Sequence, residues 1–277
     1  MRNFIAGIIA AIGFGTTAQA CSIDTACSVG ARDYYIAMPE QTGEPVPAVV
    51  YLHGAGGSGA GALRNRTMVS AFNARGFAVI APDGVARAGR NGRGWGFHPS
   101  SGRQMDEVAF LIAVRDDAIA RFGLDTDQIV LGGFSIGGSM AAYTACLAPD
   151  AFSAYAPMGG NFWRPHPVEC EGPVRLLHTH GWTDGTVPLE GRVLNNVPAN
   201  DPGARAQGDV FHAMSIWRET NECMYLKADR FVTEGAFWRR IWDRCADGTA
   251  LELAIFPGGH RVPQGWADLV VDWFEDL

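Results

Sequence analysis

The chain has 277 residues, of which 47% are apolar, and its formal net charge at neutral pH is −7. This is the composition of a globular protein that is long enough to bury a large core, and it excludes a disordered chain. No run of Lys or Arg stands out, so no nucleic-acid partner is expected.

The first twenty residues are typical of a secretion signal. Arg2 supplies a positive start, an apolar run covers 4–14, and AQA at 18–20 is a small-x-small cleavage site. A buried N-terminal helix is the alternative interpretation. The apolar run is too short to cross a bilayer comfortably, and no later stretch has membrane length, so no membrane span is expected. We therefore predict an exported protein, periplasmic or extracellular.

Alternating strand and helix signals follow this region and indicate an α/β fold, with a mostly parallel central sheet and helices on both faces. The apolar, β-branched run at 47–52 is typical of a strand buried on both faces, and 77–81 is a second such run. A helix is expected between them at about 63–75, where Gly76 ends it.

Residues 83–103 are rich in Gly and Arg and have no clear period, so we expect a long surface loop, which is often a functional feature. Apolar residues then recur on one helical face over 104–122, and Gly123 closes that helix. A short strand at 129–131 leads almost directly into a helix at 136–147.

The remaining elements are expected as strands at 153–158, 174–178 and 251–256 and as helices at 209–220 and 266–277. Residues 187–208 are turn-rich and are not assigned to an element. No internal repeat, low-complexity tail or Ser/Thr-rich linker is visible, so residues 21–277 are expected to form one domain.

Six cysteines follow the signal region: Cys21, Cys27, Cys146, Cys170, Cys223 and Cys245. An even count in an exported chain predicts disulfides, although six cysteines allow fifteen full pairings. Pairing between neighbours in sequence is favoured, and buried free thiols are the alternative. Cleavage after residue 20 would leave Cys21 first, but the preceding Ala18 and Gln19 make a poor lipoprotein signal.

The segment 133–137 matches the pattern G-x-S-x-G around Ser135. A predicted strand enters this segment and a helix of small residues leaves it, which is the setting of a nucleophile on a sharp turn. Such a turn strains the serine backbone and exposes the hydroxyl, while the glycines allow strand and helix to approach closely. A Gly/Ser turn without reactivity is the alternative.

A serine hydroxyl is a weak nucleophile and needs a base, and the base needs a group that orients it. Around such a turn the partners follow in the order Ser, acid, His. His260 comes just past the last expected strand, and Asp184 comes just past the strand that ends near His178. Both therefore lie at carboxyl ends of strands, where α/β sheets place their sites. Ser135, Asp184 and His260 are the predicted catalytic residues.

Other histidines and acids compete for these roles. His178 and His180 form an H-x-H pair that could in principle bind a metal, but no third ligand with suitable spacing is evident. Packing or hydrogen-bonding roles are favoured for this pair, and no metal site is expected. The other candidates do not follow the last strand or lie in poorly defined segments: His166, His212, Asp201 and Asp209.

The Gly-rich segment 53–57 follows the first buried strand. Glycines let backbone N–H groups point at a substrate oxygen, and the N–H groups of Ala55 and Ile136 are predicted to form an oxyanion hole. An ordinary βα turn is the alternative, and a phosphate loop would need G-K-[ST], which is missing.

Together these segments resemble the secreted esterase family that groups polyhydroxybutyrate depolymerases with feruloyl and acetylxylan esterases. The matching pieces are LHGAGG at 52–57, GWG at 94–96, DEVAFL at 106–111, the stretch from FGLD to GFSIGG at 122–138, HGWTDGTVP at 180–188 and GGH at 258–260. They run in family order over most of the chain beyond the signal region. The GWG loop with the DEVAFL helix is more particular to this group than the serine motif.

The resemblance implies an α/β-hydrolase fold and a secreted serine carboxylic-ester hydrolase that works through an acyl-enzyme, without metal or organic cofactor. It implies the same triad, and disulfides between Cys146 and Cys170 and between Cys223 and Cys245. Two departures are informative. Arg261 follows His260 where many relatives have Trp-Pro-Gly, so we expect it to alter the rim of the acyl pocket. No separate polymer-binding domain is evident, which favours a soluble small ester or an oligomer.

Trp95, Trp163 and Trp182 are candidates for aromatic walls around a feruloyl or sugar group, with core packing as the alternative. The expected substrate is a small aromatic, acetyl or hydroxyalkanoate ester, and depolymerisation of polyhydroxyalkanoate oligomers is the alternative activity. A peptidase is less expected. A non-catalytic binding protein on the same scaffold would be marked by a missing triad residue, and all three are present.

Overall fold

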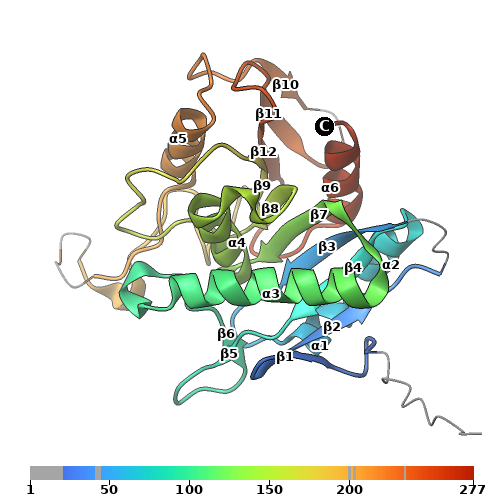
Figure 1. The fold of residues 1–277 in the computed structure, drawn as a ribbon. Helices are drawn as coiled ribbons and strands as arrows, with labels where there is room; N and C mark the ends of the chain where they lie inside the picture. The colour runs from blue at the N-terminus through green and yellow to red at the C-terminus, as the bar shows by residue number, and fades with distance from the viewer. Residues whose placement is uncertain (1–20, 41–44, 199–200, 202–203, 234) are drawn as a thin grey trace, which may run out of the picture.

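The computed structural model describes residues 21–40, 45–198, 201, 204–233 and 235–277. The predicted secretion signal at 1–20 lies outside the described residues. Within them, ten strands form one sheet in the order β1-β2-β4-β3-β7-β8-β9-β12-β11-β10, and a separate two-stranded ribbon pairs β5 with β6 (Figure 1).

The strands are β1 Cys27–Val29, β2 Arg32–Ala37, β3 Val46–Leu52, β4 Ala78–Pro82, β5 Val85–Ala86, β6 Arg93–Gly94, β7 Leu124–Phe134, β8 Ala154–Met158, β9 Arg175–Gly181, β10 Arg230–Val232, β11 Trp238–Trp242 and β12 Ala250–Phe256. The α-helices are α1 Gly59–Leu63, α2 Arg66–Ala74, α3 Gln104–Phe122, α4 Ile136–Leu147, α5 Val210–Thr220 and α6 Trp266–Glu275. Three 3-10 helices cover Pro99–Ser101, Pro149–Ala151 and Leu194–Asn196.

The six central strands, from β4 to β12 in the sheet order, run parallel to one another. Two antiparallel strands extend the sheet at each edge. Every residue of β4 and of β8 is buried, as expected for strands covered on both faces. The predicted mostly parallel sheet of an α/β fold is thereby confirmed.

Helices cover both faces of the sheet. α3, α4 and α5 pack on one face, where Leu111, Met140 and Trp217 share one apolar cluster. α2 and α6 pack on the opposite face, where Phe72 and Trp266 meet edge to face with ring centroids 5.9 Å apart. One strand layer between two helix layers leaves the carboxyl ends of the parallel strands free to carry loops.

The helix over 104–122 ends where predicted, because Gly123 adopts the left-handed conformation at its C-terminus. The single helix expected at 63–75 is instead α1 and α2, since Ser58 and Asn65 each cap a helix start through their side chains.

The loop at 83–103 is not wholly at the surface. Trp95, Phe97 and His98 within it are buried, and β5 and β6 form a short ribbon in it. The expectation of a surface loop is therefore wrong for its middle, because aromatic side chains fold back into the protein there.

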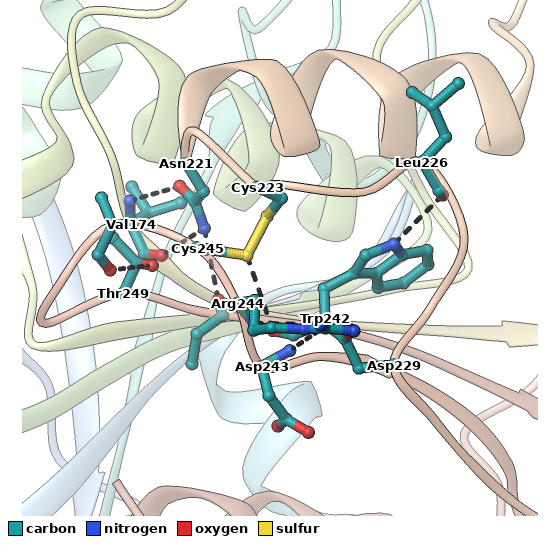
Figure 2. The surroundings of a disulfide bond; sticks show 12 residues. Val174, Asn221, Cys223, Leu226, Asp229, Trp242, Asp243, Arg244, Cys245 and Thr249 are labelled. Carbon is teal, nitrogen blue, oxygen red and sulfur yellow. Dashed lines mark hydrogen bonds and ion pairs between the residues drawn. A yellow bond between two sulfur atoms is a disulfide. The ribbon is translucent and has the colours of Figure 1, made fainter.

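The six cysteines form three disulfides between sequence neighbours, Cys21–Cys27, Cys146–Cys170 and Cys223–Cys245. Disulfides persist in oxidising compartments, so these three indicate an extracellular or periplasmic environment. Figure 2 shows Asn221 beside the third disulfide, where its side chain exchanges two hydrogen bonds of 2.8 Å with the backbone of Val174. The end of α5 is thereby fastened to the start of β9.

No helix in the described part of the chain is long and apolar enough to cross a bilayer.

Candidate active site

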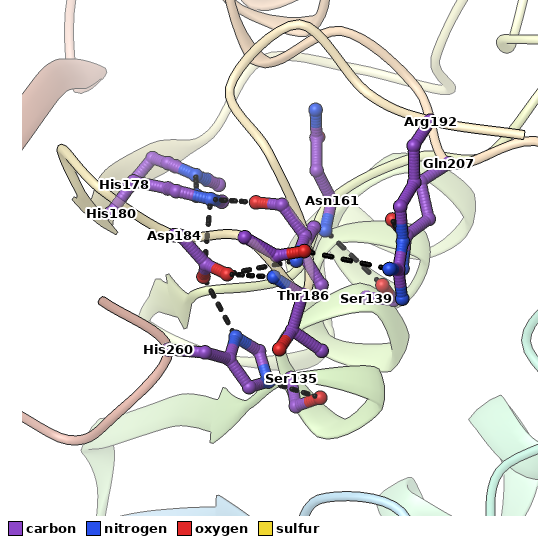
Figure 3. A network of polar contacts seen from close by, with 12 residues as sticks. Ser135, Ser139, Asn161, His178, His180, Asp184, Thr186, Arg192, Gln207 and His260 are labelled. Atoms are coloured by element: carbon purple, nitrogen blue, oxygen red, sulfur yellow. Dashed lines mark hydrogen bonds and ion pairs between the residues drawn. The ribbon is translucent and has the colours of Figure 1, made fainter.

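The three predicted catalytic residues follow three strands whose carboxyl ends lie at one edge of the sheet. Ser135 directly follows β7, Asp184 lies three residues beyond β9, and His260 lies four residues beyond β12. β7, β8, β9 and β12 are adjacent and parallel, so their carboxyl ends meet at the same edge. Residues far apart along the chain are thus brought side by side (Figure 3).

The three side chains form a continuous hydrogen-bond chain. His260 Nε2 lies 2.9 Å from the Ser135 hydroxyl, and His260 Nδ1 lies 2.7 Å from Asp184 Oδ2. A carboxylate can only accept, so Nδ1 carries the hydrogen and Nε2 is left to accept the serine proton. The structure therefore brings together all three residues that the sequence predicted, in the tautomer that a general base requires.

The backbone at Ser135 is strained. Its φ is 59° and its ψ is −124°, outside the regions that non-glycine residues prefer. A Cβ on Gly160 would lie 1.8 Å from the Ser135 carbonyl oxygen, and a Cβ on Gly137 would lie 2.2 Å from that of Leu52. Glycines at these positions allow the close approach that a sharp strand-to-helix turn needs, and the turn presents the serine at the sheet edge.

Asp184 is held by its own loop. Its Oδ1 accepts the backbone N–H groups of Thr186 and Val187, both at 2.8 Å. The burial of this carboxylate acts to raise its pKa, but hydrogen bonds from His260, Val187 and Thr186 outweigh burial and hold the pKa of Asp184 below its usual value. Asp184 is therefore ionised at neutral pH and can orient and stabilise a protonated His260.

The two predicted oxyanion donors, the N–H groups of Ala55 and Ile136, belong to segments that adjoin Ser135. Ile136 is the first residue of α4, so its N–H has no partner within the helix. Ala55 lies in the turn after β3, beside Gly54, whose Cβ would lie 3.4 Å from Ser135 Cβ. Neither N–H donates to another group of the described residues. Both can therefore bind an oxyanion that forms next to Ser135.

The turn that contains Ala55 is held by a ribbon strand. Gly56 N–H donates to the Arg93 carbonyl at 2.8 Å, and Arg93 N–H donates to the Gly57 carbonyl at 3.2 Å. The Arg93 side chain also pairs with buried Asp83 at 3.0 Å. These contacts fix the turn before a substrate arrives, which is what electrostatic stabilisation of a transition state requires.

The predicted aromatic walls differ in exposure. Trp95 is 7% exposed and donates its indole N–H to the His53 carbonyl at 2.9 Å, and Trp163 is also buried. The burial of Trp95 favours the packing role that was its alternative, and contact between Trp95 and a substrate stays a prediction. Trp182 is 58% exposed and lies two residues before Asp184, so it is the one of the three whose ring is open to solvent.

The H-x-H pair lies behind the acid. His178 Nε2 lies 3.0 Å from His180 Nδ1, and His180 Nε2 lies 2.7 Å from the Val187 carbonyl. Burial lowers the pKa of both imidazoles, so both are neutral at pH 7. In the described part of the chain, no group of three His, Cys, Asp or Glu side chains is placed to hold a metal ion.

The other candidates lie elsewhere. His166 and His212 contact each other, with ring centroids 4.4 Å apart, and Asp209 caps α5 by accepting the N–H of His212. The sequence did not single out His53, Asp83 or Glu107, all buried polar residues that hydrogen-bond the loops around the site. The sequence feature that could have identified them is weak: each is a polar side chain at the end of a predicted strand or within an otherwise apolar helix.

Comparisons with known proteins agree with this architecture. A family model described as the alpha/beta hydrolase fold matches residues 47–196. Over 172 residues the chain is 34% identical to "Putative esterase NocK" of Nocardia uniformis subsp. tsuyamanensis, which covers 60% of this chain and 46% of that protein. The chain thus spans about half the length of this curated relative.

Solved structures agree as well. An acetyl xylan esterase from Aspergillus awamori superimposes with a TM-score of 0.64 at 17% identity, covering 89% of this chain and 95% of that chain. A carboxylesterase from Mesorhizobium loti superimposes with a TM-score of 0.59 at 16% identity, covering 91% and 99%. At such low identity these likenesses show the fold alone.

Proposed function

Because the chain belongs to the alpha/beta hydrolase fold family, we propose that it is a serine ester hydrolase with Ser135 as nucleophile. The observation that carries this proposal is the hydrogen-bond chain from Ser135 through His260 to Asp184, at 2.9 and 2.7 Å. The strained serine turn supports it, and so does the 34% identity to a relative named as an esterase.

The reaction is a two-step acyl transfer. The oxygen of Ser135 bonds to the ester carbonyl carbon while its proton moves to Nε2 of His260, and Asp184 stabilises the imidazolium. The N–H groups of Ala55 and Ile136 hold the oxyanion. The carbon–oxygen bond to the alcohol then breaks, and the Nε2 proton leaves with the alcohol. Water repeats the sequence and frees the acid. The nucleophile, the base, the acid and the oxyanion donors of this reaction are thus all groups of the protein.

Export is part of the proposal. The disulfides fit an oxidising compartment, and the sequence of residues 1–20 supports a cleaved signal that leaves Cys21 first. N-terminal sequencing of the protein recovered from outside the cytoplasm tests this point. Recovery with Met1 still attached argues against cleavage.

The substrate class is proposed as a small soluble ester: acetyl, feruloyl or similar, with hydroxyalkanoate oligomers as the second candidate. Trp182 supports an aromatic group, because it is exposed and next to the acid loop. A panel of methyl ferulate, acetylated xylan, short 4-nitrophenyl esters and hydroxybutyrate oligomers, ranked by kcat/KM, decides among them. Replacement of Trp182 by Ala is expected to lower the feruloyl rate more than the acetyl rate.

The decisive experiment replaces Ser135 with Ala and measures hydrolysis of 4-nitrophenyl acetate by the purified protein. Loss of one triad member costs about 10⁴-fold or more in kcat in serine hydrolases. Ser70→Ala is the matched control, because Ser70 is exposed on α2 and contacts no part of the site. Near-normal turnover by Ser135→Ala excludes Ser135 from the mechanism.

A labelling experiment separates an enzyme from a binding protein on the same scaffold. A fluorophosphonate should modify the native protein at Ser135, and mass spectrometry of the digested protein locates the adduct. Asp184→Asn should react much more slowly, because the imidazole tautomer is lost. A peptidase gives the same adduct, so a matched amide and ester of one acyl group must be compared, and ester cleavage without measurable amide cleavage is expected.

A further inference from the structure

Three loops around the proposed site each carry an arginine. Arg87 lies beside the turn that holds Ala55, Arg192 lies against the loop that holds Asp184, and Arg261 directly follows His260. All three loops leave the carboxyl edge of the parallel strands, which is the edge where Ser135 lies.

Arg87 and Ile136 both lie close to Gly94. A Cβ on Gly94 would lie 3.4 Å from Arg87 Cγ and 3.5 Å from Ile136 Cδ1. The guanidinium of Arg87 also reaches the turn after β3, since its Nη1 would lie 3.6 Å from a Cβ on Gly56. The aliphatic part of Arg87 therefore lies near the side chain of Ile136, and its guanidinium lies next to the turn that holds Ala55.

Arg192 and Arg261 occupy the other two sides. Arg192 donates from Nη1 to the Gly185 carbonyl at 3.4 Å and from Nε to Gln207 at 3.1 Å, and Figure 3 shows it beside Gln207. Arg261 is exposed, and its Nη2 would lie 3.0 Å from a Cβ on Gly258 in the loop of the base. Arg192 is therefore anchored near the acid, and Arg261 lies near the base.

The described arginines fall into two groups. Some pair with carboxylates, as Arg75 does with Asp272, Arg230 with Asp243 and Arg244 with Asp229. Others do not, including several exposed arginines far from the site, such as Arg64, Arg66 and Arg240. Among the described residues, no carboxylate lies within ion-pair distance of Arg87, Arg192 or Arg261.

Carboxylates are scarce in the same loops. Asp184 is buried and bound to His260, and Asp83 is buried and paired with Arg93. The carboxylates that remain there are Glu190, Asp201 and Asp209, and Asp209 is a helix cap. The loops at this edge of the sheet therefore carry three guanidinium groups that no carboxylate of the described residues neutralises, on a chain with a net charge of −7, and unpaired positive charge of this kind attracts anions.

We propose that the natural ester carries a carboxylate in addition to the scissile bond, and that Arg87, Arg192 and Arg261 attract and hold this carboxylate. This inference rests on the proposed function. A guanidinium binds a carboxylate with two parallel N–H donors, so it gives both attraction and orientation. The carboxylate can belong to the acyl part or to the alcohol part of the ester, and the experiment distinguishes the two.

The experiment compares matched esters by kcat/KM at low ionic strength. In the first pair the charge is on the acyl part: mono-4-nitrophenyl adipate carries a free carboxylate, and 4-nitrophenyl heptanoate is its neutral counterpart. In the second pair the charge is on the leaving group: 4-acetoxybenzoate carries the carboxylate, and 4-acetoxybenzamide is its neutral counterpart. In at least one pair the anionic ester should react about tenfold faster, the lower end of electrostatic steering. The preference should shrink in 1 M NaCl, where screening acts over about 3 Å.

Variants assign the effect to the arginines. Arg87→Gln, Arg192→Gln and Arg261→Gln together should bring the anionic-to-neutral ratio near one, and the corresponding Lys variants should keep most of it. Arg175→Gln is the control, because it removes the same charge at the amino end of β9, the opposite edge of the sheet. An unchanged ratio in the triple Gln variant, or an equal loss in Arg175→Gln, overturns the assignment.

Failure of this inference is distinguishable from failure of the proposed function. If both neutral esters are cleaved in a Ser135-dependent way and neither anionic ester is preferred, the anionic substrate is excluded and the esterase stands. If no ester in either pair is cleaved, the proposed function fails and the anionic substrate fails with it.

Discussion

His180 donates its Nε2 hydrogen to the carbonyl oxygen of Val187 at 2.7 Å, and the N–H of the same Val187 donates to Asp184 Oδ1 at 2.8 Å. A carbonyl only accepts, so the hydrogen of His180 is on Nε2, and its Nδ1 accepts from His178 at 3.0 Å. The buried histidine pair thus ties the acid loop to β9 through one residue, Val187. It acts on the reaction only through Asp184.

Replacement of His180 by Leu should therefore loosen the acid loop. A lost buried hydrogen bond costs ~1–3 kcal/mol, so kcat should fall by about tenfold or more while KM changes little. Gln at position 180 can place an N–H near the Nε2 position and should restore most of kcat. Steady-state kinetics on 4-nitrophenyl acetate measure both variants. Equal losses for Leu and Gln indicate that His180 only fills space.

Gly160 should not tolerate a side chain. Its Cβ would lie 1.8 Å from the Ser135 carbonyl oxygen and 2.7 Å from the Ser139 nitrogen, both backbone atoms that cannot rotate away. Gly160→Ala should lower the free energy of unfolding by about 1–3 kcal/mol and reduce activity by shifting the serine turn. Gly185→Ala is the control for stability, because no atom lies within 4 Å of its Cβ position. Equal melting temperatures for the two variants contradict this account.

The elements that the sequence predicted best are those with a strong local signal. α3 has an apolar face and a left-handed Gly123 after it, and both of its bounds were predicted. β11 was missed because WRRIW has two adjacent arginines and no regular alternation of polar and apolar residues at a half-exposed edge. β10 and β1 are only three residues long, too short for a period to be visible. Edge strands are defined by the neighbour they pair with, which sequence periodicity does not encode.

The same division applies to the site. The placement of Ser135, Asp184 and His260 followed from strand order and from the glycines around the serine, both of which are local patterns. The buried polar groups that hold the loops were not predicted, because their hydrogen bonds join segments far apart in sequence. Glu107 lies on α3 yet accepts the N–H of Gly96, and Asp83 accepts that of Gly59. Such partners become visible only when the chain is folded.

Stability should depend on pH through Asp184. The pKa of this carboxyl is lowered in the folded protein, because hydrogen bonds from His260 and from two backbone N–H groups outweigh its burial, which acts to raise the pKa. The ionised carboxylate therefore stabilises the fold above the unfolded pKa of about 3.9, and this contribution is lost as the pH falls through the lower folded value. The difference in unfolding free energy between the native protein and Asp184→Asn should be large near pH 7 and should shrink below about pH 4. Urea denaturation at several pH values measures this difference. A difference that stays constant down to pH 3 contradicts a stabilising role of the ionised Asp184 carboxylate.

The Cys146–Cys170 disulfide should contribute more stability than Cys21–Cys27. The two bonds close segments with sequence separations of 24 and 6, and the loss of chain entropy in the unfolded state grows with that length. The loop-entropy relation gives about 3 kcal/mol for the longer loop and about 2 kcal/mol for the shorter one. Paired Cys→Ala variants compared by chemical denaturation test the order. The reverse order indicates that local packing around the bonds outweighs loop entropy.

The buried pair of Arg32 and Glu107 should behave differently from a surface pair. Glu107 Oε2 lies 2.8 Å from Arg32 Nη1 with only 1% of the Glu107 side chain exposed, and the guanidinium carbon lies 3.5 Å from the centre of the Phe110 ring. Burial lowers the pKa of Arg32 and the attraction of Glu107 opposes this, so the two charges depend on each other. Glu107→Gln keeps the shape and an acceptor for Gly96 but leaves Arg32 buried without a counter-charge.

Breaking such a pair costs about 3–5 kcal/mol, whereas removal of an exposed pair costs about 1 kcal/mol or less. Glu107→Gln should therefore lower the unfolding free energy several times more than Asp243→Asn, which breaks the exposed pair with Arg230. The double variant Arg32→Met with Glu107→Met should recover much of the loss, because neither charge is then left buried alone. If the double variant is as unstable as the sum of the two single Met variants, the two charges are not coupled, and the loss comes from packing against Phe110 instead.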